Sequence, residues 1–292
     1  MKILTLILSL AACLPNLVYS QHSRVIETRT LRSEILGMER RYSVYLPACY
    51  DVSDRSYPVL YLLHGSGDDH TGWVQFGQVH NIADRVIAEG LAGPMIIVMP
   101  DANTGVRGYF NTINGNFNYE DFFFDELIPH IEKTYRVRSE RRYRAISGLS
   151  MGGGGTIFYA LHRPNMFAAA APLSAATGNW DLEQFRQRSR ANNNTMQLSD
   201  KQIEDWFNRH SIESLIKNAT EDELRQIKSV RWYISNGDDD FLYEGNARLH
   251  ILFRQNDIPH QFRIKEGGHN WTYWRMELPI VMEFVAKSFM QH

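Results

Sequence analysis

The sequence predicts an α/β fold in which a mostly parallel central sheet is covered by helices on both faces. Short apolar runs alternate along the chain with longer segments of helical spacing, which is the order of elements in such folds. The short runs are nearly continuous, as expected for strands that are buried on both faces. The length of 292 residues allows one domain of this kind with a large core.

Each expected strand is a run rich in Val, Ile, Leu or Tyr, and each expected helix has apolar residues at helical spacing. The strands are expected at Val44–Leu46, Pro58–Leu63, Met95–Met99, Tyr143–Ile146, Phe167–Leu173, Val230–Ile234 and Phe262–Ile264. The helices are expected at Asn81–Glu89, Tyr119–Tyr135, Gly153–His162, Glu244–Gln255 and Thr272–Met290. Functional loops should follow the carboxyl ends of the strands.

The segment 178–229 interrupts this alternation. It is polar and helical in its spacing, and it lies between two expected core strands. We interpret it as a helical insertion near the strand ends. It is either a cap or lid over a site, or a helical excursion with no role in binding.

The composition argues against several other classes of protein. Lysine and arginine total 31 and aspartate and glutamate total 33, so the formal net charge is −2. Hydrophobic residues make up 43% and charged residues 22%, which excludes a disordered, collagen-like or disulfide-dense chain. The near-neutral charge argues against a nucleic-acid partner, because such proteins need basic residues to neutralise phosphates.

The first twenty residues have the features of an export signal. Lys2 is followed by the apolar run 3–10, and small residues precede Gln21. We therefore expect a signal peptide at 1–20, a single mature domain at 21–292, and a periplasmic or extracellular protein without a transmembrane span. The alternative is a lipid anchor at Cys13. Only Cys49 remains besides Cys13, so neither an internal disulfide nor a zinc site is expected.

A nucleophile is indicated by Gly148-Leu149-Ser150-Met151-Gly152, which matches G-x-S-x-G. The motif follows an expected strand and opens an expected helix, which is the context it requires. The two glycines avoid collisions at the tight turn, and the start of the helix directs free N–H groups and its positive end at developing negative charge. We expect Ser150 to attack an acyl group.

A serine nucleophile needs a histidine base and an orienting carboxylate, in the chain order Ser, Asp or Glu, His. Of the histidines after Ser150, only His269 follows Gly267-Gly268 in a loop between a strand and a helix. We expect His269 to be the base. For the acid, Asp238, Asp239 and Asp240 all follow the strand at 230–234, and the residues alone leave the three open. Calcium binding is another reading of this acidic loop.

The loop after the strand at 58–63 is expected to complete an oxyanion hole. Its sequence continues as His64-Gly65-Ser66-Gly67. A backbone N–H from this loop usually acts with the N–H of the residue after the nucleophile. We assign the N–H groups of Ser66 and Met151, with Gly67 as the alternative to Ser66.

Aromatic residues gather near the expected strand ends, and they are candidates for substrate binding or for core packing. They are Trp73, Tyr109, Phe110, Trp180, Trp271 and Trp274. Of these, Trp73, Tyr109, Trp180 and Trp271 are the substrate-binding candidates. No cofactor and no metal ion are expected.

Six motifs together resemble the esterase D-like group of α/β-hydrolases, and within it the carbohydrate esterase family 1 enzymes, which include feruloyl and acetylxylan esterases. The motifs are Tyr45-Leu46-Pro47, Tyr57 to Gly65, Tyr119 to Phe123, Gly148 to Gly153, Asp240 to Glu244 and Gly267 to His269. The resemblance covers about residues 24–289. It implies Ser150 as nucleophile, Asp240 as acid and His269 as base. The loop 102–109 departs from the usual pattern, so no binding role is carried over there.

The resemblance implies a secreted serine carboxylesterase that hydrolyses feruloyl or acetyl esters of plant cell-wall polysaccharide. Its substrate would be an ester-bearing small molecule or polysaccharide. One alternative is a general short-chain acyl esterase or a thioester hydrolase of the same group. The other is a non-catalytic carbohydrate-binding protein, which an intact Ser150, Asp240 and His269 argue against.

Overall fold

The computed structural model describes residues 22–192 and 195–290. The expected signal peptide at 1–20 and the alternative lipid anchor at Cys13 therefore lie outside the described residues. Over the described ranges, no helix is long and apolar enough to cross a membrane.

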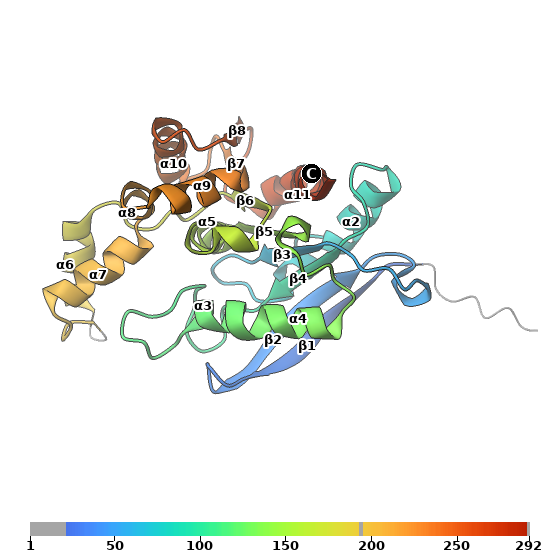
Figure 1. The fold of residues 1–292 in the computed structure, drawn as a ribbon, viewed down its shortest axis with the longest axis horizontal. Helices are drawn as coiled ribbons and strands as arrows, with labels where there is room; N and C mark the ends of the chain where they lie inside the picture. The colour runs from blue at the N-terminus through green and yellow to red at the C-terminus, as the bar shows by residue number, and fades with distance from the viewer. Residues whose placement is uncertain (1–21, 193–194, 291–292) are drawn as a thin grey trace, which may run out of the picture.

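One eight-stranded sheet forms the centre of the molecule (Figure 1). The strands are β1 (Arg24–Ser33), β2 (Met38–Leu46), β3 (Val59–Leu63), β4 (Ile96–Pro100), β5 (Arg144–Leu149), β6 (Ala169–Leu173), β7 (Arg231–Gly237) and β8 (His260–Lys265). Their order is β1-β2-β4-β3-β5-β6-β7-β8. The pairs from β4 to β8 are parallel, whereas β1, β2 and β4 pair antiparallel.

Helices cover both faces of this sheet, which confirms the predicted fold class. They are α1 (Gly72–Gln75), α2 (Val79–Ala88), α3 (Tyr119–Asp121), α4 (Ile128–Thr134), α5 (Met151–His162), α6 (Leu182–Ala191), α7 (Asp200–His210), α8 (Ile212–Lys217), α9 (Glu221–Ser229), α10 (Tyr243–Gln255) and α11 (Trp271–Met290). Short 3-10 turns lie at η1 (Tyr50–Val52), η3 (Arg141–Tyr143) and η4 (Pro164–Met166), and a π-helical turn, η2 (Phe122–Leu127), joins α3 to α4.

The core is divided into two layers by the alternation of side chains along each strand. In β3, Val59, Tyr61 and Leu63 face the layer under α3–α5 and α10, whereas Leu60 and Leu62 face the layer under α2 and α11. Every residue of β3 is buried. This two-sided burial explains why the central strands appear in the sequence as continuous apolar runs.

The edge strand β1 was not predicted from the sequence. Within the described ranges it pairs only with β2, and most of its residues are exposed or half-buried. An antiparallel edge strand has one solvated face, so polar residues such as Arg, Thr and Glu occupy it and no apolar run appears. The structure adds this strand to the seven that the sequence predicted.

The segment 178–229 contains α6, α7, α8 and α9, and α6 and α7 project away from the sheet (Figure 1). Each of these helices begins at a side chain that accepts a backbone N–H of the first turn, namely Asp181, Ser199, Ser211 and Thr220. Ser199 and Thr220 form complete capping boxes. Local capping therefore specifies these short helices, as expected for a polar segment outside the sheet.

Candidate active site

The turn between β5 and α5 holds Ser150 in a strained backbone conformation. Its φ and ψ angles are 54° and −115°, in a region that residues with a side chain rarely adopt. Backbone hydrogen bonds hold it there: the Ser150 N–H donates to Leu173 O at 2.9 Å, and Ser150 O accepts from Ala176 N–H at 2.9 Å. The strain is thus maintained by the neighbouring strand β6 and the loop that follows it.

The two glycines of the motif allow this turn to pack without space for a side chain. A Cβ atom at Gly148 would lie 2.6 Å from Gly152 O, and one at Gly152 would lie 2.6 Å from His64 O. Both contacts are with backbone, which cannot rotate away. The predicted role of the glycines is therefore explained by contacts between β5, the start of α5 and the loop after β3.

Three side chains from distant parts of the chain meet at this turn. His269 lies in the loop between β8 and α11, and its Nε2 is 2.9 Å from Ser150 Oγ. Its Nδ1 is 2.9 Å from Asp240 Oδ2, in the loop after β7. Because a carboxylate can only accept, Nδ1 carries the proton, and Nε2 accepts from the serine hydroxyl. The structure thus brings together the three residues that the resemblance implied.

Asp240 is held in its ionised form by its surroundings. Burial raises the pKa of this carboxyl, but hydrogen bonds from His269, the Leu242 N–H and the Ser174 hydroxyl together hold the pKa below its ordinary value. The side chain is inaccessible to solvent, and the Leu242 N–H lies 2.8 Å from Oδ1. A carboxylate in this state stabilises positive charge on the neighbouring imidazole.

The other two aspartates of the loop have different surroundings. Asp238 Oδ1 accepts the Gly267 N–H at 2.8 Å, which joins the loop after β7 to the loop after β8. Among the described residues, Asp239 makes no hydrogen bond or ion pair with His269, whose carboxylate partner is Asp240. Within the same ranges, no group of three or more His, Cys, Asp or Glu side chains is placed to hold a metal ion.

The expected oxyanion-hole residues lie on either side of Ser150. Met151 is the first residue of α5, where backbone N–H groups lack an intrahelical acceptor. Gly65, next to Ser66, lies so close that a Cβ atom there would be 3.5 Å from Ser150 Cβ. Both loops therefore border the nucleophile, and the roles of the Ser66 and Met151 N–H groups stay predictions.

His64 organises the loop that carries Ser66, a role that was not predicted from the sequence. The Ala102 N–H donates to His64 Nε2 at 2.9 Å, so Nδ1 carries the proton and donates to Gly65 O at 2.8 Å. Burial lowers the pKa of His64, which keeps the ring neutral in this role. The sequence feature that could have indicated this role is the position of His64 immediately after the strand β3.

The aromatic candidates separate into buried and accessible residues. Trp73 and Tyr109 are completely buried. They donate hydrogen bonds to Leu63 O and His64 O, respectively. These hydrogen bonds support the end of β3 and the start of the loop that follows it. Their complete burial corrects the expectation that the two rings contact substrate. Trp180 and Trp271 are half-buried and stay candidates for substrate contact.

Phe241 is an aromatic residue at the site that was not among the candidates predicted from the sequence. It directly follows Asp240, its side chain is 70% exposed, and its ring centroid lies 4.5 Å from that of His269. With Trp180 and Thr177 it borders a cavity of about 640 Å³, which we call the proximal cavity. The exposed ring is a flat apolar surface beside the base.

Comparison with known proteins agrees with this geometry. The model of the Esterase family matches residues 33–283. An endo-1,4-beta-xylanase/feruloyl esterase of Xylanibacter ruminicola is 39% identical over 159 residues, which covers 52% of this chain and 22% of that protein. The chain thus matches less than a quarter of that relative's length.

Two solved structures share the fold over most of their length. A ferulic acid esterase is 36% identical with a TM-score of 0.79, covering 91% of this chain and 99% of its own. An S-formylglutathione hydrolase from Staphylococcus aureus is 22% identical with a TM-score of 0.72, at coverages of 91% and 99%. The second likeness concerns the fold alone. The fold is that of the α/β-hydrolases.

Proposed function

The chain belongs to the Esterase family of carboxylic ester hydrolases, and on that premise we propose that it is an exported serine esterase that hydrolyses feruloyl or acetyl esters of plant cell-wall xylan. The observation that carries the chemistry is His269, hydrogen-bonded to both Ser150 Oγ and Asp240. The substrate class is supported by the relatives named as feruloyl esterases.

In the proposed reaction, Ser150 Oγ attacks the ester carbonyl carbon while its proton moves to His269 Nε2. The carbonyl oxygen becomes an oxyanion, to which the N–H groups of Ser66 and Met151 donate. When the carbon–oxygen ester bond breaks, His269 returns the proton to the leaving alcohol, and an acyl-enzyme remains. Water then attacks the acyl carbon, losing its proton to His269, and the acid is released with Ser150 restored.

Two features of the site favour an aromatic acyl or alcohol group. Phe241 presents an exposed ring next to His269, and Trp180 lies in the same proximal cavity. Flat rings gain from contact with such surfaces. A feruloyl group carries a flat ring that can pack on Phe241, whereas an acetyl group is too small to cover this exposed ring.

The test is a comparison of esters with the purified full chain and its Ser150→Ala variant. Methyl ferulate, acetylated xylan and a butyrate ester would be compared by kcat/KM. We expect ferulate or acetate release to dominate, and Ser150→Ala to lower it by about 10⁵-fold or more. A clear preference for butyrate would replace the xylan substrate with a general short-chain ester. Full activity of Ser150→Ala would refute the mechanism.

A further inference from the structure

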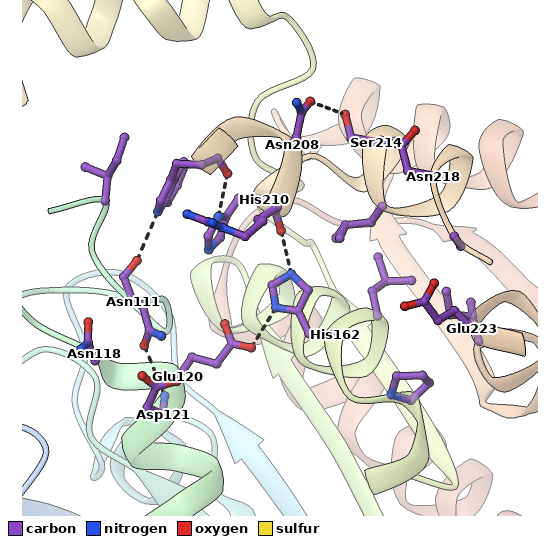
Figure 2. A pocket seen from close by; sticks show the side chains of 18 of the residues that line it. Asn111, Asn118, Glu120, Asp121, His162, Asn208, His210, Ser214, Asn218 and Glu223 are labelled. Carbon is purple, nitrogen blue, oxygen red and sulfur yellow. Dashed lines mark hydrogen bonds and ion pairs between the residues drawn. The ribbon is translucent and has the colours of Figure 1, made fainter. Parts of the chain in front are cut away.

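A large cavity, which we call the distal cavity, lies at the end of α5 remote from Ser150. Its volume is about 810 Å³, within the range of ligand pockets. Its walls are the loop 111–118, the start of α3, the last turn of α5 and the helices α7, α8 and α9 of the segment 178–229 (Figure 2). Ser150 precedes α5 and His162 ends it, so the 12 residues of this helix separate the two ends by about 18 Å.

The lining of the distal cavity is rich in neutral groups that both donate and accept hydrogen bonds. Its amide residues are Asn111, Asn118, Asn165, Asn208, Asn218 and Gln226. Asn208 and Asn111 already bond Ser214 Oγ and the Asp121 N–H. Among the described residues, the amides of Asn118, Asn165 and Asn218 make no hydrogen bond to protein and are available to a ligand. Figure 2 shows Asn118 and Asn218 in the lining.

Several charged groups around this cavity are already engaged. His162 lies between Glu120 and Arg209 O, at 2.8 and 2.7 Å, as Figure 2 shows. Glu223 accepts from the Thr220 N–H and hydroxyl in a capping box. Burial lowers the pKa of His210 to about 4, so its ring is neutral at neutral pH. The other charged side chains of the lining, Asp121 and Arg209, have opposite signs, so no single charge dominates the cavity. Its amides suit an uncharged, polyhydroxylated ligand.

A third, smaller cavity of about 310 Å³ borders both the distal and the proximal cavity, so the three cavities mark out a path. This linking cavity shares Asn179 and Arg188 with the proximal cavity, and Ile113 and Trp206 with the distal one. The path follows the seam between the helices of 178–229 and the loop after β4. The cavities begin at Phe241, whose ring lies beside that of His269, and end at the far end of α5.

Trp206 forms a rigid wall of this path. Phe185 stacks on its ring at 5.2 Å and His210 at 3.8 Å between centroids. Its Nε1 lies 3.4 Å from Asn111 O, across the seam. Because Trp206 already stacks with these two rings, recognition in the distal cavity depends chiefly on hydrogen bonds to the amides.

We infer that the distal cavity is a second binding site for neutral sugar units of the same polysaccharide chain whose ester is cleaved at Ser150. This inference rests on the proposed function, because it assigns the sugar backbone of that substrate to the seam. The helices of 178–229 then serve as one wall of an extended groove. Sugar units bound there raise the affinity for a long ester substrate without touching the reacting atoms.

Binding of unesterified xylohexaose and cellohexaose to the inactive Ser150→Ala chain tests the site without requiring turnover. The blocking change is Asn218→Trp, at an exposed position of the lining, and the matched control is Gln255→Trp, at the exposed end of α10 outside every cavity named above. We expect the blocking change to weaken binding of at least one sugar about tenfold, and the control to leave it unchanged. The double change Asn118→Ala with Asn165→Ala should weaken it similarly, even if Asn218→Trp misfolds.

The same changes in the active enzyme should lower kcat/KM on a feruloylated xylo-oligosaccharide through KM, with methyl ferulate cleaved as before. The inference would be overturned if neither sugar showed saturable binding. It would also be overturned if neither Asn218→Trp nor the double change altered the affinity. A chain that releases neither ferulate nor acetate, yet binds a sugar in the distal cavity, would overturn the proposed substrate and leave this site standing.

Discussion

Two histidine–carboxylate pairs lie at opposite ends of α5, and their Nδ1–oxygen distances are nearly equal. His269 and Asp240 meet at 2.9 Å beside Ser150, and His162 and Glu120 meet at 2.8 Å at the other end. The third partner differs. His269 Nε2 faces a hydroxyl that can donate a proton, whereas His162 Nε2 faces the carbonyl oxygen of Arg209, which can only accept.

The difference shows that the partner of Nε2 decides what a histidine–carboxylate pair does. His162 must donate from both nitrogens, so it is an imidazolium. Burial lowers its pKa, but the hydrogen bond and charge of Glu120 raise it more, so the net pKa is raised. Its two hydrogen bonds link α5 to α3 and α7, so its positive charge has a role in the structure and not in the reaction. His269 keeps one nitrogen unprotonated and can accept a proton during reaction.

The largest expected effect comes from replacing the carboxylate of each pair by an amide. Asp240→Asn should lower kcat on the order of 10³- to 10⁴-fold, because an amide supports the wrong tautomer and no longer stabilises the imidazolium. Glu120→Gln is the matched control and should change kcat by less than about twofold. Steady-state ester hydrolysis measures both. Equal losses in the two variants would contradict the different roles given to the pairs.

The start of α5 packs closely against the end of β3 and the loop after it, which a single added methyl group tests. Gly152→Ala places a Cβ atom 2.6 Å from His64 O and Leu63 O, so we expect a loss of about 3 kcal/mol in unfolding free energy, together with reduced activity. Gly93→Ala is the control, since no atom lies within 4 Å of a Cβ there. Urea unfolding checks the pair of variants, and a Gly152→Ala chain as stable as Gly93→Ala would rule out the tight contact.

The smallest effect concerns pH and the Glu120–His162 pair. The pKa of His162 is raised in the folded chain, so its contribution to stability is complete below the unfolded value of about 6.5 and is lost as pH rises through the folded pKa. Glu120→Gln removes the cause of the raised pKa. The difference in unfolding free energy between the wild type and this variant should therefore be larger near about pH 5.5 than near about pH 9. These two pH values lie on either side of the titration of His162.

Thermal unfolding at the two pH values measures this difference. A difference that does not change with pH would mean that His162 is not an imidazolium in the folded chain. Asp240→Asn serves as a comparison in the same scans, because it changes the carboxylate beside His269 and leaves the Glu120–His162 pair intact.

Much of the fold could be predicted because the signals are local. The central strands appear as apolar runs since both their faces are covered, and β3 is an example in which every residue is buried. The nucleophile turn was predictable for the same reason, because Gly148, Ser150 and Gly152 are neighbours in the chain. The edge strand β1 was not predicted, because a strand at a solvated edge requires no apolar run.

The site was predictable only in part. The residues left Asp238, Asp239 and Asp240 open, and the resemblance selected Asp240, whose Oδ2 lies against His269. Trp73 and Tyr109 carry the same aromatic signal as Trp180 and Trp271, yet the first two are completely buried. An aromatic residue near a strand end suits a core and a binding surface equally well, so the sequence cannot separate the two.

By itself the sequence determined the order of the seven strands after β1 and of the helices between them, the tight turn at Ser150 and the type of chemistry that such a turn supports, because these depend on neighbouring residues. Tertiary structure alone decided which distant groups meet. His269 and Ser150 are 119 positions apart, and His162 reaches Glu120 from 42 positions away. Contacts across such separations depend on how the helices pack on the sheet, and no local pattern in the chain records that packing.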